Sequence, residues 1–358
     1  MTQPDHDLLV IFGAGASFDS HPRVPPESAM TELPMPLDDD AAGALWWRPP
    51  LANQLFHDRY ARVQSDYPHL LPLINRLRPT TTSGQGSWSL EGVLDRLSAE
   101  AGQTPVRHQQ LLAVRFYLSH LLTKITRYWS GALFGTSNYA SILDTIQHCT
   151  GAARVTLATF NYDSLLEIAL ALPTIDHQFK HLDDYFTAPK FSLIKLHGST
   201  NWVQSVEGGP ADLMRQGHVV PSKIIAAGAE IQVAARVEMA DNHPSTHVVP
   251  ALAIPRSTGK GFVCPRSHIA HLEGAVNRTR KVIVVGWRAT DGHLLELVAK
   301  HQQTPWRFLI AQGNQSDARD VADRIKGAGV RLVDSDSALV DDGFSGLLTS
   351  DVLGSFLS

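Results

Sequence analysis

Cysteine is scarce in this sequence, with only Cys149 and Cys264 among 358 residues. Because each stands alone, the chain cannot supply a four-cysteine zinc site, and it has no disulfide framework. Long apolar runs are also missing, since none approaches the roughly 18 residues of a membrane helix. The first residues, MTQPDHDLLVIFGAG, lack the basic and apolar regions of a signal peptide. We therefore expect a soluble, cytoplasmic protein.

An excess of basic residues is lacking as well. The net charge is −4 with His neutral, which does not fit a dedicated nucleic-acid binder, and we expect no direct contact with nucleic acid or membrane. Hydrophobic residues make up 43% and charged residues 18%, the balance of a globular protein with ample material for a core. The length allows one large domain or two of ordinary size.

Short apolar segments recur along the chain and predict buried strands. The first is LLVIF after Asp7, and several later ones are followed by amphipathic helical stretches. Buried strands alternating with helices indicate an α/β fold, a mostly parallel sheet with helices on both faces. The later segments are RVTLATF (154–160), FSLIKLHG (191–198), KVIVVGW (281–287), WRFLIAQG (306–313) and VRLVDS (330–335).

Two segments interrupt this alternation. Seven prolines between positions 21 and 50 exclude a long helix or a central strand, and predict an irregular loop. From about 51 to 149 the pattern is helical. In SLEGVLDRLSAEAG, apolar residues from Leu90 to Leu97 follow the spacing of one helix face, and HQQLLAVRFYLSHLLTKITRYWS predicts a longer helix. We expect these helices to form an insertion between the first two strands.

The first predicted strand ends in Gly13-Ala14-Gly15. Glycine lets the backbone approach a ligand closely, and the N-terminus of a following helix would favour a phosphate. The dinucleotide pattern G-x-G-x-x-G is incomplete, because Phe18 stands at its third glycine. A tight turn after a strand is the alternative explanation of the two glycines.

Asn161 and Asp163 lie at a junction in ATFNYDSLLEIAL (158–170), which begins like a buried strand and ends like an amphipathic helix. One polar residue is enough to cap the helix. The other needs a different partner, which a ligand cleft at the end of a parallel strand would supply.

Polar residues also follow two later strands. LIKLHGSTNW places His197 at the same predicted sheet edge as Asn161, where a histidine can act as a base, although a structural role is the alternative. VIVVGWRATDGHLLEL places Gly286 at a strand end and Asp291 before a helix, where it either caps the helix or contacts a ligand.

Two histidine pairs have spacings found among metal ligands. They are His177 with His181 and His268 with His271. No carboxylate or cysteine completes a site beside either pair, so we expect no metal.

Five motifs, in their order along the chain, resemble the sirtuin family, and specifically its sirtuin-like branch in bacterial antiphage systems. They are FGAGAS, TFNYD, KLHGS, VVGW followed by Asp291, and FLIAQGN, and they extend from about Leu8 to Asn314. The resemblance implies that the glycine-rich turn holds the phosphates of NAD, that Asn161 lies beside the nicotinamide ribose, and that His197 is the catalytic base. It also implies that Asp163 contributes to the nicotinamide pocket and that Gly286 borders the adenosine half.

The chain departs from the deacylating sirtuins in two ways. Those enzymes carry a zinc module held by four cysteines, and a proline-aspartate-phenylalanine-arginine stretch after the glycine turn; neither occurs here. Sirtuin-like defence proteins share both departures and degrade NAD. After the strand of FLIAQGN, Gln312 and Asn314 are alternative candidates for a ribose contact.

We therefore predict one sirtuin-like domain over 1–358: a Rossmann-like, doubly wound parallel sheet with an inserted helical module and no zinc module. The core covers about 7–20, 150–202 and 280–335, the helical insertion about 51–149, and the irregular loop 21–50. The candidate catalytic residues are Asn161 and His197. The candidate cofactor-binding residues are Gly13, Ala14, Gly15, Ala16, Ser17, Thr159, Asp163, Gly286, Asp291 and Asn314.

The predicted function is hydrolysis of NAD+ to nicotinamide and ADP-ribose, in an antiphage system that depletes NAD. The alternatives are an NAD-dependent deacylase or ADP-ribosyltransferase, and a non-catalytic sensor of NAD or ADP-ribose. A dehydrogenase fits less well, because the glycine fingerprint is incomplete. An enzyme that destroys NAD must be restrained, so we expect a homo-oligomer or a regulatory partner. The resemblance suggests a HerA-type ATPase or a short Argonaute as that partner.

Overall fold

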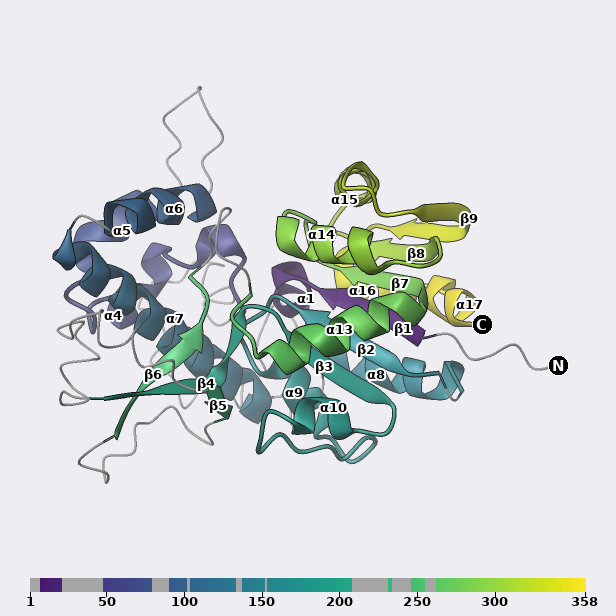
Figure 1. The fold of residues 1–358 in the computed structure, drawn as a ribbon, viewed down its shortest axis with the longest axis horizontal. Helices are drawn as coiled ribbons and strands as arrows, with labels where there is room; N and C mark the ends of the chain where they lie inside the picture. Colours follow the sequence, from purple (N-terminus) through teal and green to yellow (C-terminus); the bar gives the residue numbers. More distant parts are fainter. Residues whose placement is uncertain are drawn as a thin grey trace.

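A six-stranded parallel sheet forms the centre of the molecule (Figure 1). The structure is a computed structural model, and it describes residues 7–20, 48–78, 90–101, 104–132, 137–151, 153–207, 231–233, 246–254 and 262–358. The strand order is β3-β2-β1-β7-β8-β9, and each neighbouring pair is parallel. Counted within this sheet alone, that is the order 3-2-1-4-5-6 of a Rossmann-like fold. The strands are β1 Asp7–Phe12, β2 Val155–Thr159, β3 Phe191–Lys195, β7 Thr279–Val285, β8 Trp306–Ala311 and β9 Leu332–Val340.

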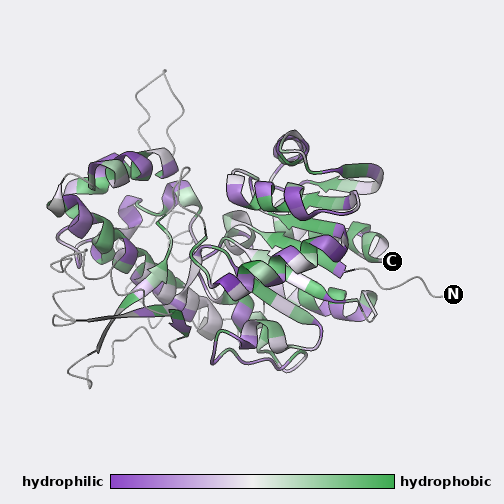
Figure 2. Ribbon diagram, viewed as in Figure 1, coloured by the Kyte–Doolittle hydropathy of each residue, from purple (hydrophilic) through white to green (hydrophobic). Residues whose placement is uncertain are grey.

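Both faces of the sheet are covered by helices, which confirms the predicted doubly wound α/β fold. In β1, Val10 and Phe12 pack into one core while Leu9 and Ile11 pack into the other, since neighbouring side chains of a strand point to opposite faces. This accounts for the unbroken apolar run of the strand, and Figure 2 shows the strands as the most hydrophobic part of the fold. One face carries α13 Arg266–Arg278, α14 Gly292–His301 and α15 Gln315–Gly327; the other carries α8 Asn138–Cys149, α16 Gly343–Thr349 and α17 Val352–Leu357.

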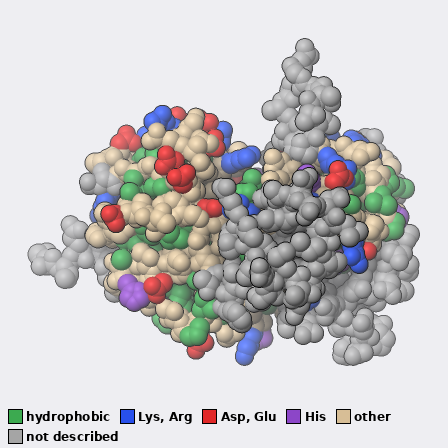
Figure 3. All heavy atoms as spheres, turned by 180° about the vertical axis from the view of Figure 1, so that it is seen from behind, with side chains coloured by type: hydrophobic (Ala, Val, Ile, Leu, Met, Phe, Trp, Pro, Cys, Tyr) green, Lys and Arg blue, Asp and Glu red, His purple; other side chains and the backbone are tan. Residues whose placement is uncertain are grey.

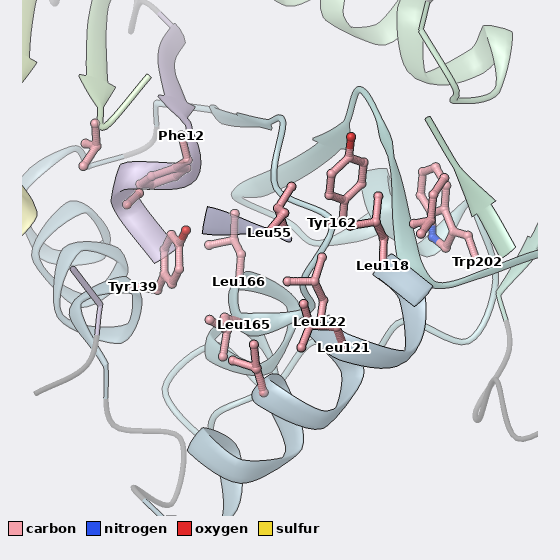
Figure 4. Close-up of a cluster of buried hydrophobic side chains, with 14 of the residues drawn as sticks. Phe12, Leu55, Leu118, Leu121, Leu122, Tyr139, Tyr162, Leu165, Leu166 and Trp202 are labelled. Atoms are coloured by element: carbon pink, nitrogen blue, oxygen red, sulfur yellow. The ribbon is translucent and has the colours of Figure 1, made fainter. Parts of the chain in front are cut away.

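A group of helices stands beside the sheet, on the left in Figure 1. In α6 the predicted apolar face from Leu90 to Leu97 is buried, as expected. The longest helix, α7, has 28 residues and packs both against α6 of this group and against α9 of the core. In the shared apolar cluster its Leu118 lies beside Tyr162, and its Leu122 lies nearer Leu165 of α9 (Figure 4). The elements are η1 Ala52–Gln54, η2 Asp58–Tyr60, α4 Ala61–Gln64, η3 Leu71–Leu73, α5 Ile74–Leu77, α6 Leu90–Ala101 and α7 Pro105–Ala132, with α9 at Leu165–Leu170.

The last helix of the predicted insertion, α8, lies with the sheet rather than with this group. It packs against α9, α16 and α17. Most of the predicted loop 21–50 lies outside the described residues, which resume at Arg48. The division of the chain into a core and an insertion stays a prediction.

A second sheet, which the sequence patterns did not predict, is formed by the chain between β3 and β7 of the central sheet. It is antiparallel, with the order β5-β4-β6, and it packs against α7. Gly198 opens it in a left-handed conformation, with φ +81°, and a Cβ there would lie 2.0 Å from the Ala251 carbonyl oxygen. Glycine is therefore required directly after His197. The strands are β4 Gly198–Glu207, β5 Ile231–Val233 and β6 Thr246–Leu252, and the short helix α10 spans Asp184–Thr187.

The described surface carries charges of both signs. Acidic and basic side chains are interspersed over the sheet half of the molecule seen from behind (Figure 3). Within the described ranges, no helix combines the length and the apolar character needed to cross a membrane.

His268 of α13 is a fully buried titratable group outside the predicted site. Its exposed fraction is 0%, and its ring lies 4.5 Å from that of Phe186 and 5.2 Å from that of Trp202. Neither ring nitrogen makes a well-formed hydrogen bond among the described residues, although the Leu182 backbone lies close enough to favour the protonated ring. Burial, followed by the nearby His271, lowers the pKa of His268 from 6.5 to about 4.

This burial predicts a specific loss of stability in acid. Between about pH 6.5 and about pH 4 the unfolded chain binds a proton at His268 that the folded chain does not, so the free energy of unfolding should fall by up to about 3 kcal/mol. Urea unfolding across this window should show a smaller loss for His268→Leu than for the parent. His148→Leu, on the exposed surface of α8, is the control and should keep the parental pH dependence. Equal losses in the parent and His268→Leu would refute this account.

Candidate functional site at the carboxyl edge of the sheet

The backbones that leave β1 and β7 touch each other. The Gly13 N–H donates to the Val285 carbonyl at 3.0 Å, and the Gly15 N–H donates to the Gly286 carbonyl at 3.1 Å. A Cβ on Gly13 would lie 2.5 Å from the Gly286 oxygen, and one on Gly286, at φ +61°, would lie 2.4 Å from the Ala16 nitrogen. This contact alone explains the three glycines. It also lies where the strand order reverses, which is where doubly wound sheets bind ligands.

The short helix α1, Ala14–Phe18, follows this contact. Ala14 and Gly15 are partly exposed, whereas Ala16 and Ser17 are buried. The Arg48 guanidinium lies 3.9 Å from the centre of the Phe18 ring. The position of the missing third glycine is thus occupied by a side chain that packs against a cation.

Ser17 is the centre of a buried hydrogen-bonded cluster that joins the ends of β1 and β2. Its Oγ donates to Asp163 Oδ2 at 2.8 Å and lies 2.8 Å from the Tyr139 hydroxyl. Asn161 Nδ2 lies 2.9 Å from the same Oγ and donates to the Gly13 carbonyl at 2.8 Å. Four sequence-predicted residues are therefore brought together, along with Tyr139 from α8.

The orientation of the Asn161 amide follows from these contacts. The Gly13 carbonyl can only accept, so the amide atom facing it must be Nδ2. The Asn161 side-chain oxygen, Oδ1, faces the other way and has no hydrogen-bond partner among the described residues. Asn161 is only 7% exposed. The site thus presents one fixed hydrogen-bond acceptor at the end of β2.

Asp163, rather than Asn161, bonds the start of the following helix, whose N-cap residue, Ser164, makes no side-chain capping bond. Asp163 Oδ1 accepts from the Leu165 N–H at 3.2 Å, at the first residue of α9. Burial raises the pKa of Asp163, and the Lys195 ammonium and the Ser17 hydroxyl offset part of that rise. Its predicted place in a nicotinamide pocket stays a prediction.

His197 and Asp291 form a pair at the same edge. His197 Nε2 lies 3.2 Å from Asp291 Oδ2, and the two side chains are 22% and 17% exposed. Asp291 Oδ1 also accepts from the Leu294 N–H at 2.8 Å and caps α14, so one carboxylate both caps the helix and holds the histidine. Burial would raise the pKa of Asp291, but hydrogen bonds from His197 and Leu294 hold it below its usual value.

The tautomer of His197 is set by this pair. An ionised carboxylate only accepts, so Nε2 carries the proton and Nδ1 is left as the acceptor of the neutral ring.

Aromatic rings that the sequence analysis did not single out surround His197. Its ring centre lies 5.0 Å from that of Phe160, edge to face, and 6.2 Å from that of Tyr162. Phe160 stacks on Trp287 at 5.3 Å with an interplanar angle of 8°. The alternation of a strand end places Phe160 and Tyr162 beside His197 while Asn161 points toward Ser17. The aromatic residues on either side of Asn161 were the sequence signal for this arrangement.

Three buried polar residues behind the edge were also missed. They are Tyr139, Glu167 and Lys195. The signal for Lys195 was its place inside the apolar run FSLIKLHG, where a charged side chain needs a partner. For Tyr139 in its amphipathic helix, no comparable signal exists.

The remaining predicted contacts serve the fold. Thr159 Oγ1 accepts from the Asn161 N–H at 3.1 Å. Asn314 is exposed and caps α15, because its Oδ1 accepts from the Asp317 N–H at 2.8 Å while its Nδ2 donates to the Asp317 carboxylate. Gln312 is buried and donates to the Trp287 carbonyl at 2.8 Å. A ribose contact by Asn314 stays a prediction.

Neither histidine pair is part of a metal-binding cluster. In the described part of the chain, no group of three or more His, Cys, Asp or Glu side chains could hold a metal ion. His177 contacts the Asp184 carbonyl, and His271 stacks on Phe186 at 4.8 Å.

The glycine contact predicts a large difference between two alanine substitutions. Gly286→Ala should lower the free energy of unfolding by at least about 2 kcal/mol, because it places a Cβ against backbone atoms at positive φ. In the matched control Gly292→Ala, a Cβ would meet nothing within 4 Å, so the change should stay within about 1 kcal/mol. Urea unfolding of both variants measures the difference. A Gly286→Ala protein of parental stability would contradict the observed contact.

Comparisons with known proteins gave matches in structure only. No family model and no curated protein matched the sequence. The fold is similar to a Sir2 protein solved with an inhibitor, 2′-O-acetyl-ADP-ribose and a deacetylated peptide (11% identity, 98% of this chain, 90% of that chain, TM-score 0.36). It is also similar to a Sir2 homologue in complex with NAD (12%, 90%, 88%, 0.32) and to a Sir2 homologue mutant with ADP-ribose (12%, 98%, 91%, 0.36). Because these TM-scores are low, the fold of this chain is assigned from its own strand order and register.

Proposed function

We propose that this chain hydrolyses NAD+ to nicotinamide and ADP-ribose at the carboxyl edge of its sheet. The observation that carries the proposal is that one edge of the sheet holds both a fixed hydrogen-bond acceptor and an oriented histidine. Asn161 presents Oδ1 at the end of β2, and Asp291 holds His197 beside Phe160 and Tyr162. Asn161 bonds Gly13 of the glycine contact, and His197 is linked to it through Phe160 and Trp287. At this contact the strand order reverses and a dinucleotide would bind.

The reaction breaks the bond between nicotinamide and the anomeric carbon of the ribose. Positive charge develops on the ribose in an oxocarbenium-like transition state, so the enzyme must fix the ribose and deliver water to one face. Asn161 Oδ1 would accept a hydrogen bond from a ribose hydroxyl or from the attacking water. Because Gly13 and Ser17 hold the other end of the amide, this acceptor needs little reorganisation.

His197 would take the proton. In the tautomer set by Asp291, Nδ1 accepts a proton from a ribose hydroxyl or from water. The Asp291 carboxylate then stabilises the imidazolium ion that forms. Asp291 is suited to this role because its pKa lies below the usual value, which keeps it ionised.

The order of the five motifs supports this proposal over its alternatives. The chain has too few cysteines for the zinc module of the deacylating sirtuins, which disfavours transfer to an acyl-lysine. A sensor that binds without turnover would not need an oriented base. On the same resemblance we propose that the protein is an NAD-depleting effector of a cytoplasmic antiphage system. Its restraint would come from a homo-oligomer or from a partner such as a HerA-type ATPase or a short Argonaute.

The first test removes the two predicted catalytic groups. Asn161→Ala and His197→Ala should each lower the rate of nicotinamide release by at least about 100-fold. Asn161→Ala also loses buried hydrogen bonds, which should cost about 1–3 kcal/mol of stability, so circular dichroism must show that it is folded. Nicotinamide and ADP-ribose are quantified after incubation with NAD+, with and without candidate partners. Release at the parental rate from both variants would make the assignment wrong.

A second substitution tests the His197 tautomer. In Asp291→Asn the side-chain oxygen still caps α14, but the amide NH2 now donates to His197 Nε2 and moves the ring proton to Nδ1. We expect unchanged stability and a loss of at least about 100-fold in kcat. Urea unfolding of Asp291→Asn beside the parent checks that the cap of α14 is kept. Full activity in Asp291→Asn would mean that Nδ1 is not the base.

A further inference from the structure

A buried ion pair lies directly behind the candidate site. Lys195, the last residue of β3, is 0% exposed, and its Nζ donates to Glu167 Oε1 at 2.8 Å and to the Asp163 carbonyl. Glu167 comes from α9 and is 5% exposed. Its Oε1 also accepts from the Ser199 and Tyr185 hydroxyls, each at 3.3 Å. One carboxylate oxygen therefore joins β3, β4 and α10.

These contacts hold the turn of His197 from both sides. Lys195 stands two residues before His197 and bonds the Asp163 carbonyl, while the Thr200 N–H bonds the Tyr162 carbonyl at 2.8 Å beyond it. β2 and β3 pair in register only up to Thr159 and Lys195. Past that point the Leu196 N–H still bonds Thr159, and the Ala253 N–H bonds the His197 carbonyl at 2.8 Å. Lys195 and Glu167 add a side-chain link between the two connections and the start of β4.

Stability alone does not explain the pair. Burying two charges carries a desolvation penalty that can exceed the energy of their attraction. A protein with an apolar pair of similar volume in their place is often as stable or more stable. The cost is increased by Glu167 Oε2, which is buried and has no hydrogen-bond partner among the described residues. A charged pair retained at this place therefore points to a role in the site.

We propose that Lys195 and Glu167 are positioning residues that hold His197 at a fixed place relative to Asn161. They touch no substrate. Lys195 and Glu167 hold the two connections that carry the acceptor and the base, so that the geometry needed in the transition state exists before binding. This proposal rests on the proposed hydrolysis of NAD+, because it assigns the two residues to that reaction.

The test replaces the whole pair by apolar residues. Lys195→Met combined with Glu167→Leu removes both charges, so no unpaired charge is left buried. The Ser199 and Tyr185 hydroxyls lose an acceptor, so activity is measured well below the melting temperature of the variant. We expect kcat for nicotinamide release to fall about 10- to 100-fold with KM within about threefold, because positioning acts mainly in the transition state. The matched control is Arg278→Met with Asp7→Leu, which removes a 2.7 Å ion pair at the opposite end of β1 and should leave kcat unchanged.

A conservative variant separates positioning from packing. Glu167→Gln keeps an acceptor for Lys195 and Ser199, so it should retain more activity than the double apolar variant. A double apolar variant with parental kcat and parental melting temperature would overturn the proposal.

A spectroscopic measurement keeps this test separate from that of the proposed function. If the parent releases no nicotinamide either alone or with the candidate partners, hydrolysis is refuted. The 15N shifts of the His197 ring, assigned with His197→Gln, then report its position directly. A larger change in the double apolar variant than in the control variant supports the positioning role, and equal shifts overturn it.

Discussion

The backbone contact between Gly13–Gly15 and Gly286 is the constraint on which the candidate site depends. It brings the ends of β1 and β7 together with no side chain between them. The Gly13 carbonyl is fixed by this contact and accepts a hydrogen bond from Asn161 Nδ2, so the Asn161 side-chain oxygen faces the other way. On the other strand, the chain leaving Gly286 passes Trp287, which supports the Phe160 ring beside His197, and reaches Asp291. The positions of Asn161 and His197 thus depend on one contact between three glycines.

The central sheet could be predicted because burial on both faces requires unbroken apolar strands, as in LLVIF and KVIVV. The antiparallel sheet could not, because its strands contain Gly198, Asn201 and Pro250 and show no clear apolar alternation. α8 was assigned to the insertion because an amphipathic helix shows which of its faces is buried but not which partner covers that face. Strand ends, in contrast, indicated correctly that residues far apart in sequence share an edge.

Within the site, residue type was easier to predict than residue contact. Sequence left open whether Asn161 or Asp163 caps α9; the Leu165 N–H bonds Asp163, and Asn161 is the polar side chain left over. For Asp291, a helix cap and a ligand contact were the alternatives; its Oδ1 caps α14 and its Oδ2 contacts His197, and a ligand contact stays a prediction. The apolar run around Lys195 indicated that it needs a partner, but not that the partner is Glu167, because a long charged side chain at a strand end can turn to solvent or to the interior.

The pairing of β1 with β7 also determines when the site can form. β1 is the first strand along the chain, but its register partners run from Thr279 to Val285, and the Asp291 carboxylate lies further on. Contacts between segments so distant in sequence form late, because the intervening chain must first be ordered. During synthesis on a ribosome, a chain that has not passed Asp291 holds neither the glycine contact nor the oriented histidine. The proposed activity therefore begins only when most of the polypeptide has been made and folded.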